Sequence, residues 1–330
     1  MAWNIKSLPD PMKQKIPPEA QQRHPNPTLT SLLARLAPHE GYNLSALPDV
    51  RFLRSNRPLA TTPVLYDPGI VIVCQGRKRG FFGDEVYLYD ASHYLAVSVP
   101  VPFTMETDAS AAEPLLAIYM HLDFRLAADL MLEIDRHGGA APSEPRGMLS
   151  TPMDASMQAS VLRFLQAMSD PMQAAILGPS LVRELYFHVL AGEQGHSLRA
   201  ALTMQGQFGK IARALRRIHA AYTQALDVDS LARESGMSVP SFHAHFRNVT
   251  RTSPMQYLKS TRLHQARLLM VRNGITAAAA SGEVGYESPS QFSREFKRLF
   301  GRSPVEEVRR MKAEFAIPPP HAGSPFVSSH

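Results

Sequence analysis

The spacing of apolar residues changes along the chain and divides it into two parts. Between about residues 50 and 123, apolar residues stand in short runs separated by Gly, Asp and Pro, a pattern typical of a small antiparallel β-barrel or sandwich. After residue 123 they recur every three or four positions, which predicts helices. We therefore expect an α+β chain with a β-rich first part and an all-helical last part.

The same pattern predicts individual elements. The expected strands are 69–76, 77–83, 86–90, 93–99 and 115–122. The expected helices of the first part are 30–36, one from Leu126 that ends at Gly138-Gly139, 155–168 and 179–191, with a loop up to Pro152. The last of these helices has an apolar stripe over residues 181–190, which packs either inside the domain or against a partner subunit.

One motif occurs twice in the helical part. Its landmarks are Phe242, Phe246 and Ser253-Pro254 in the first copy, and Phe292, Phe296 and Ser303-Pro304, each 50 residues later, in the second. A turn with Gly236 or Gly285 precedes each copy. A short helix, a Gly turn and a second helix with Phe at i and i+4 on its buried face is the pattern of a helix-turn-helix. Two copies predict two DNA-reading units on one chain.

The second helix of each copy has an outward face that would meet a major groove. The outward positions are Pro240, Ser241, His243, Ala244 and Arg247 in the first copy and Ser290, Gln291, Ser293, Arg294 and Lys297 in the second. Arg294 can pair with guanine and Gln291 with adenine, whereas the first helix offers only His243 and Arg247 as donors. We expect at least as much specificity from the second unit. A single helix over 254–271, if rigid, could set both units in successive grooves about 34 Å apart.

Charge is distributed unevenly along the 330 residues. The net charge is +6, but residues 209–316 hold 18 Lys and Arg against 9 Asp and Glu, a net of +9. The remainder holds 17 basic and 20 acidic residues, a net of −3. A basic C-terminal part beside a slightly acidic N-terminal part indicates a polyanionic partner for one half of the chain.

Other classes of protein are disfavoured by composition. Cys74 is the only cysteine, which excludes an intramolecular disulfide and a multi-cysteine zinc site, and in an apolar strand it is expected to be an inert buried thiol. The first 20 residues lack the pattern of a signal peptide, and no run of about 18 apolar residues occurs. We expect a cytoplasmic protein that does not enter a membrane.

The helical repeat resembles the DNA-binding domain of the AraC/XylS family of bacterial transcription regulators over about residues 210–311. The resemblance is carried by Ser253-Pro-Met-Gln-Tyr-Leu-x-x-x-Arg-Leu-x-x-Ala-Arg-x-Leu and by Gly285-Tyr-Glu-Ser-Pro-Ser-Gln-Phe-Ser-Arg-Glu-Phe-Lys-Arg-Leu-Phe-Gly-Arg-Ser-Pro304. It implies base contacts from Pro240, His243, Ala244, Arg247, Ser290, Gln291, Ser293 and Arg294. We assign Lys259, Arg262, Lys297 and Arg298 to phosphates. One departure is the helix expected at 275–284, about two residues longer than usual in the family and with Gly282 inside it.

The strand region resembles the AraC-type N-terminal domain, a cupin-like barrel followed by helices, over roughly residues 30–190. The resemblance is carried by 65–78, 83–90, 93–95 and 122–123 and implies a module that senses an effector and dimerises. Side chains that could line an effector pocket are Tyr66, Tyr87, Tyr89, Tyr119 and His121, although alternation does not decide which of them point inward.

These features predict five segments. They are a disordered lead-in (1–27), a cupin-like effector and dimerisation domain (28–192), a linker (193–209), a DNA-binding domain with two helix-turn-helix motifs (210–316) and a flexible tail (317–330). We expect a DNA-binding transcription regulator that responds to a small-molecule effector. Its expected partners are double-stranded DNA, the effector, and RNA polymerase if it is an activator. The sequence does not decide whether the chain forms a homodimer.

Two alternatives remain beside this hypothesis. The first is a regulator without a ligand, whose barrel only dimerises. The second is a cupin-type metalloenzyme fused to a DNA-binding domain, which would need a cluster of His and carboxylate ligands. His93 and His121 stand alone, and the pair His243 and His245 would not share a helix face. We therefore expect no catalytic residue, metal or cofactor.

Overall fold

The structure is a computed structural model that describes residues 27–137, 143–203 and 205–314. The expected tail, the expected lead-in up to residue 26 and the expected helix end at Gly138-Gly139 lie outside the described residues. Within the described ranges, no helix combines the length and the apolar character needed to cross a membrane.

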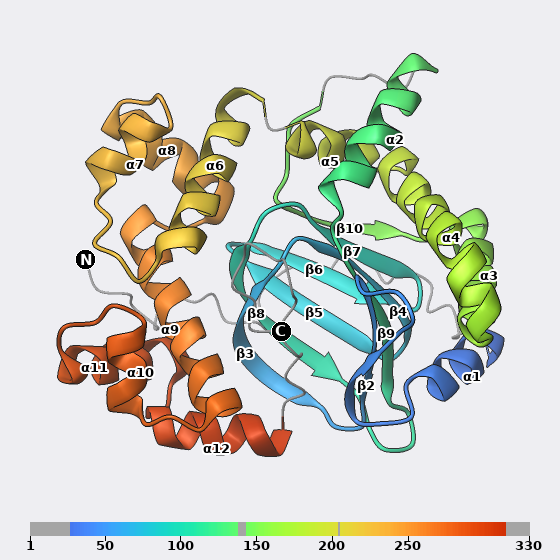
Figure 1. Ribbon diagram of the computed structural model, residues 1–330, viewed down its shortest axis with the longest axis horizontal. Helices are drawn as coiled ribbons and strands as arrows, with labels where there is room; N and C mark the ends of the chain where they lie inside the picture. Colours follow the sequence, from blue (N-terminus) through green and yellow to red (C-terminus); the bar gives the residue numbers. More distant parts are fainter. Residues whose placement is uncertain (1–26, 138–142, 204, 315–330) are drawn as a thin grey trace.

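Ten strands form two antiparallel sheets in residues 41–152 of the described chain, which we call the β-domain (Figure 1). The six-stranded sheet has the order β1 (Gly41–Leu44), β2 (Val50–Ser55), β9 (Leu115–His121), β4 (Gly69–Gln75), β7 (His93–Val97) and β10 (Met148–Pro152). The four-stranded sheet has the order β3 (Leu59–Tyr66), β8 (Val101–Asp108), β5 (Arg77–Phe82) and β6 (Glu85–Asp90). Strands β3 and β6 are therefore the two edges of the smaller sheet.

Apolar side chains fill the space between the sheets. Val71 and Leu95 of the larger sheet belong to the same buried cluster as Val64 and Phe103 of the smaller one. A second buried cluster joins the other face of the larger sheet to α1 (Pro27–Leu36), α2 (Phe124–Arg136), α3 (Ala155–Met168) and α4 (Pro171–Ala191). Because the larger sheet is buried on both faces, its central strand β4 is a continuous apolar run.

The remaining helices lie beside the β-domain (Figure 1). They are α5 (Gly195–Leu202), α6 (Gly206–Ala221), α7 (Val228–Glu234), α8 (Val239–Thr250), α9 (Pro254–Asn273), α10 (Ala277–Glu283), α11 (Pro289–Phe300) and α12 (Pro304–Glu314). We call α7 and α8 the first unit and α10 and α11 the second unit; α9 joins them. The expected fold class, a β-domain with accessory helices followed by an all-helical domain, is confirmed.

The structure corrects two sequence expectations and adds detail to a third. Helix α4 begins at Pro171, not at 179, because Asp170 caps it by accepting from the Gln173 amide and Pro179 is accommodated inside the helix. The expected loop before Pro152 contains strand β10, which pairs with β7. The expected linker 193–209 contains α5 and the first turn of α6, so the connection to the C-terminal helices is mostly helical.

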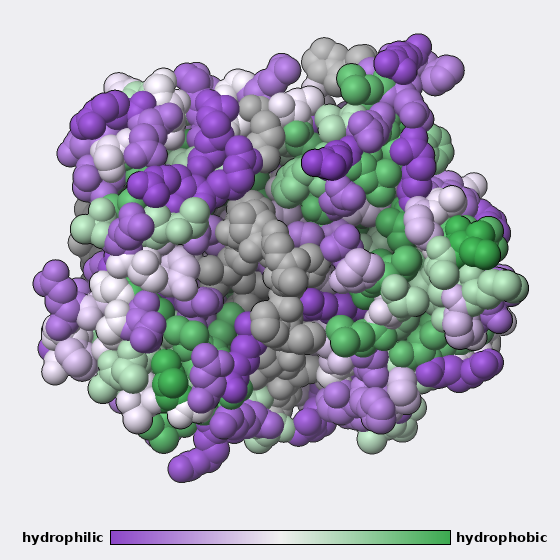
Figure 2. Space-filling view, in the orientation of Figure 1, coloured by the Kyte–Doolittle hydropathy of each residue, from purple (hydrophilic) through white to green (hydrophobic). Residues whose placement is uncertain are grey.

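The apolar stripe of α4 packs inside the domain. Leu185, Val189 and Leu190 are buried in the cluster beneath the larger sheet. A different set of apolar residues, which includes Met172 and Ile176, is exposed on α4. Figure 2 shows hydrophobic side chains gathered over α3 and α4 at the right of the view.

Candidate nucleic-acid interface

The internal repeat is preserved in the packing of the two units. Phe242 and Phe246 are fully buried, with ring centroids 5.5 Å apart and ring planes at 54°. Phe292 and Phe296 are also fully buried, with centroids 5.5 Å apart and planes at 51°. The Phe pair therefore fixes the same face of α8 and of α11 against its own unit.

Glycine turns set the entry into each of these helices. Gly236 has φ +61° and Gly285 has φ +82°, the left-handed region that favours glycine. At Gly285 an added Cβ would also lie 2.4 Å from the carbonyl oxygen of Thr223, so this position excludes any side chain. The helix before Gly285 is shorter than the expected 275–284, because α10 has seven residues, as α7 does. The additional residue of the second copy lies after Gly285, in the turn.

The expected base-reading positions lie at the surface of α8 and α11. Seven of them are exposed and His243 is half-buried; the exposed ones are Pro240, Ala244, Arg247, Ser290, Gln291, Ser293 and Arg294. Among the described residues, the guanidinium groups of Arg247 and Arg294 have no hydrogen bond or ion pair. Both groups are thus available to a partner, although contact with DNA stays a prediction.

Glu295 organises polar side chains behind the exposed face of α11. Its carboxylate accepts from Lys259 Nζ at 2.7 Å, from the Tyr286 hydroxyl at 2.8 Å and from Gln291 Nε2 at 3.3 Å. Burial raises the pKa of Glu295, but these hydrogen bonds outweigh it, so the pKa lies below its usual value. Lys259 is therefore bound to Glu295, and the phosphate contact expected of it would require breaking this ion pair.

Arg262 is hydrogen-bonded within the C-terminal helices, and the phosphate contact expected of it stays a prediction. Its guanidinium donates to the carbonyl oxygens of Tyr222 at 2.6 Å, Gln224 at 2.8 Å and Gly285 at 3.1 Å. These bonds tie α9 to the end of α6 and to the turn of the second unit. The other two phosphate candidates, Lys297 and Arg298, are exposed on the last turn of α11.

Hydrophilic side chains also cover α6 and α7, at the upper left of Figure 2.

The expected effector residues are only partly brought together. Tyr66 and Tyr89 are buried between the sheets, with their hydroxyl oxygens 3.2 Å apart. Tyr87 and Tyr119 belong to the same buried cluster, whereas His121 is half-buried at the end of β9. An effector site at these residues stays a prediction.

Lys78 is a member of this interior group that the sequence analysis missed. Its side chain is 1% exposed, its Nζ donates to the Tyr66 hydroxyl at 3.2 Å, and burial lowers its pKa to about 7. In β5 Lys78 is buried between the half-buried Arg77 and Arg79, and the three consecutive cations carry no alternation of polar and apolar residue types that would indicate this. We call Tyr66, Lys78, Tyr89 and Met105, whose sulfur accepts from the Tyr66 hydroxyl at 3.0 Å, the interior cluster.

Side chains suited to holding a metal ion do not converge in the described parts of the chain. No group of three or more His, Cys, Asp or Glu side chains there could hold a metal ion. Cys74 is buried, and desolvation raises the pKa of its thiol to about 12, so the thiolate is disfavoured at neutral pH.

Several polar contacts connect the β-domain and the C-terminal helices, among them a hydrogen bond from the Arg57 guanidinium to the Ala313 carbonyl on α12. The Tyr257 hydroxyl on α9 donates to the Pro100 carbonyl at 3.0 Å and accepts from His219 Nε2 at 2.7 Å. Arg251, at the end of α8, donates to Glu85 on β6 at 3.1 Å in an exposed ion pair. A further contact joins α9 and α12 to β3, where Arg267 donates to the carbonyl of Pro63 at 3.1 Å.

Comparisons with known proteins agree with this division of the chain. Residues 46–197 match the family described as the AraC-type transcriptional regulator N-terminus, and residues 231–310 match a helix-turn-helix domain. The chain is 34% identical over 95 residues to the HTH-type transcriptional regulator AlkR of Acinetobacter baylyi, covering 29% of this chain and 31% of AlkR. It is 36% identical over 88 residues to the RCS-specific HTH-type transcriptional activator RclR of Escherichia coli, covering 27% and 31%.

These alignments span about a third of the length of the curated relatives. Among solved structures, ToxT of Vibrio cholerae has a TM-score of 0.51 at 14% identity, covering 82% of this chain and 97% of ToxT. Identity at this level shows a common fold, with a β-domain and a helical domain in one chain.

Proposed function

We propose that this chain, which belongs to the AraC-type family of transcriptional regulators, binds a bipartite DNA site through α8 and α11 and that its β-domain controls the binding. The observation that carries the proposal is the pair of equivalent Phe-packed units, each with an exposed outward face. Helix α9 spans 20 residues between them, about 30 Å at 1.5 Å per residue, close to the 34 Å that separates successive major grooves.

The two faces differ, so the proposed site is asymmetric. Arg294 of the second unit can donate two hydrogen bonds to guanine, and Gln291 can read adenine only by giving up part of its contact with Glu295. The first unit offers Arg247 and the half-buried His243. We propose that Lys297 and Arg298 bind phosphates and that Arg262 does not.

Arg294 and Lys297 allow a direct test. In the Arg294→Ala variant we expect about 1–3 kcal/mol weaker binding to the specific site and little change on random DNA. Lys297→Ala is the matched control, since loss of a phosphate contact should weaken binding to all sequences alike and lower the salt dependence by about one charge. Equal losses on specific and random DNA for Arg294→Ala would reassign Arg294 to the backbone. A wild-type chain that does not prefer any genomic sequence would refute the proposed function.

The finer part of the proposal is an effector bound by the β-domain. The buried Lys78, Tyr66 and Tyr89 side chains support it, because they are polar groups inside an apolar domain. An effector should raise the melting temperature with its concentration, as any ligand of the native state does. The alternative, a β-domain that only dimerises, predicts no such shift in a screen of small metabolites. A homodimer and contact with RNA polymerase belong to the same proposal.

A further inference from the structure

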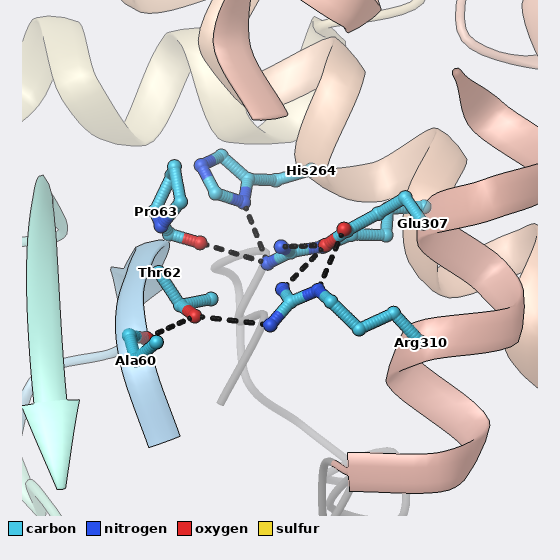
Figure 3. Close-up of polar contacts among 7 residues, drawn as sticks. Ala60, Thr62, Pro63, His264, Glu307 and Arg310 are labelled. Carbon is cyan, nitrogen blue, oxygen red and sulfur yellow. Dashed lines mark hydrogen bonds and ion pairs between the residues drawn. The ribbon is translucent and has the colours of Figure 1, made fainter. Parts of the chain in front are cut away.

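A cluster of buried charges attaches the C-terminal helices to β3 (Figure 3). We call Thr62, Pro63, Arg267, Glu307 and Arg310 the latch. Arg267 on α9 and Glu307 on α12 are fully buried and form an ion pair at 3.1 Å. Arg310 donates to both oxygens of Glu307, at 2.9 and 3.0 Å, and to the Thr62 hydroxyl at 3.3 Å. Arg267 completes the contact by donating to the Pro63 carbonyl.

The latch is in direct contact with the second unit. The Arg267 guanidinium lies 4.4 Å from the centre of the ring of Phe300, the last residue of α11. His264, which is hydrogen-bonded to Arg267 at 3.1 Å, packs its ring edge-on against the same Phe300 ring at 5.2 Å. A displacement of Arg267 therefore acts on the end of the helix that we propose reads DNA.

The two units are attached to the β-domain in different ways. Phe242 and Phe246 of the first unit belong to the same apolar cluster as the interior of the β-domain. Phe292, Phe296 and Phe300 of the second unit belong to a separate cluster, which contains no residue of the β-domain among the described residues. The first unit is thus joined through a shared core, while the latch provides buried polar attachment for the second.

Strand β3 contributes residues to both the latch and the interior cluster. Thr62 and Pro63 contact the arginines, and Tyr66, three residues later, is hydrogen-bonded inside the β-domain to groups on the other strands of the smaller sheet. Because β3 is an edge strand, only β8 restrains it laterally within the sheet. Its register with β8 shifts between Leu59 and Thr62, next to the latch.

The contact with β3 consists of hydrogen bonds from two arginines to a carbonyl and a hydroxyl, and it depends steeply on distance. Hydrogen bonds of 3.1 and 3.3 Å are lost when the atoms separate by about half an ångström. If β3 moves away, both arginines keep Glu307, but Arg267 loses the Pro63 carbonyl and Arg310 loses the Thr62 hydroxyl. A buried donor left without its acceptor costs about 1–3 kcal/mol. An apolar contact, in contrast, changes gradually with distance because it depends on buried area.

We propose that β3 couples the interior of the β-domain to the second unit, so that a change at the interior cluster loosens the latch and releases the end of α11 while the first unit stays attached. This proposal rests on the proposed function, since it names the route by which the β-domain controls DNA binding. It makes Thr62, Arg267 and Arg310 positioning residues for α11.

Hydrogen–deuterium exchange of the full-length chain tests the route without DNA. Tyr66→Phe and Tyr89→Phe remove only interior hydroxyls, and we expect exchange in 263–273 and 304–314 to rise about fivefold or more with α8 unchanged. Arg310→Met, made in the latch itself, should give the same pattern. Glu85→Gln is the matched control, because it weakens the exposed contact of the first unit and should leave 304–314 unchanged. Unchanged exchange in 304–314 for the tyrosine variants, or an equal rise in α8, would overturn the proposal.

DNA binding then separates this inference from the proposed function. We expect Tyr66→Phe and Arg310→Met to change the affinity for the full site by about fivefold or more, to combine non-additively in the double variant, and to have no effect when the half-site of the second unit is scrambled. Additive effects, or equal effects on both sites, would overturn the coupling. If the wild type binds no specific site, the proposed function fails, whereas the exchange pattern still decides whether β3 couples the two regions.

Discussion

Cationic side chains with similar sequence contexts have different environments in this protein. Lys78 is flanked by Arg77 and Arg79, and it alone of the three is buried. Arg262 and Arg267 are five residues apart on α9. Arg262 donates to backbone carbonyls of the C-terminal helices, whereas Arg267 donates to a backbone carbonyl of β3. The partner of each residue is remote in the sequence, so charge alone indicates a basic surface and overestimates the number of side chains free to bind DNA.

The buried amine of Lys78 should make stability depend on pH. Its pKa falls from 10.5 to about 7 in the folded chain, so between these values the unfolded chain binds a proton that the folded chain does not. The free energy of unfolding should therefore rise with pH above about 7, by at most about 1.4 kcal/mol per unit from this group. We expect Lys78→Met to remove this rise in urea titrations between pH 7 and about 9, below the range where tyrosines of the unfolded chain ionise.

The same pH series on Arg79→Met provides the control, because Arg79 is exposed enough to bind Glu106 and Asp108 at the surface. A pH dependence that survives in Lys78→Met would mean that the amine is solvated or paired in the native state.

Replacement of Arg262 should reduce stability more than it reduces DNA affinity. The Arg262→Ala variant removes three hydrogen bonds to part-buried or exposed carbonyl oxygens, and a typical hydrogen bond contributes about 0.5–1.5 kcal/mol. We expect a lower midpoint in urea unfolding and an unchanged salt dependence of DNA binding. A salt dependence that falls by about one charge would restore Arg262 as a phosphate contact.

At the scale of elements, the sequence predicted correctly those helices whose bounds depend on residues close in the sequence. Helix α3 has the predicted bounds because Asp154 caps it and its apolar stripe is regular. The strands missed by the sequence analysis depend on their partners. Strand β3 contains Thr61, Thr62 and Pro63 and is stabilised by pairing with β8, and β10 is a five-residue strand that pairs with β7.

Helix α10 contains a glycine that its structure does not require. Gly282 has no neighbour within 4 Å of an added Cβ, and its φ lies outside the left-handed region. Because glycine in a helix interior costs about 0.5–1 kcal/mol relative to alanine, Gly282→Ala should raise the free energy of unfolding by this amount. Gly285→Ala, three residues later, should be destabilising, since both its φ and the Thr223 carbonyl exclude a Cβ. Thermal unfolding of the Gly282→Ala and Gly285→Ala variants checks whether the first is more stable and the second less stable than the wild type. Destabilisation by Gly282→Ala would mean that α10 needs the glycine.

At the scale of the whole molecule, one apolar cluster crosses the boundary between the β-domain and the first unit. Phe246 shares this cluster with Phe103 and Val101 of β8, while Phe296 belongs to the separate cluster of the second unit. Phe246 and Phe296, which occupy equivalent positions of the repeat, therefore stabilise different parts of the molecule: Phe246 packs with the β-domain and Phe296 within the separate cluster of the second unit.

Truncation of the two equivalent phenylalanines should show this difference. Phe246→Ala and Phe296→Ala each remove a fully buried ring, at a cost of about 3–5 kcal/mol. We expect Phe246→Ala to accelerate amide exchange in β8 as well as in α8, and Phe296→Ala to accelerate it mainly in α10 and α11. Equal protection of β8 in the two variants would show that the first unit unfolds independently of the β-domain.

The sequence by itself determined the repeat, the identity of the two units and the residues on their outward faces, because helix periodicity, glycine turns and Phe pairs act over a few residues. The tertiary structure decided which cations remain available to DNA, that Lys78 lies inside the β-domain, and that the two units are attached to it by different contacts. These properties depend on pairings such as Arg267 with Pro63, about 200 residues apart. A buried charge requires a partner, but nothing in its neighbouring residues specifies which distant strand will provide it.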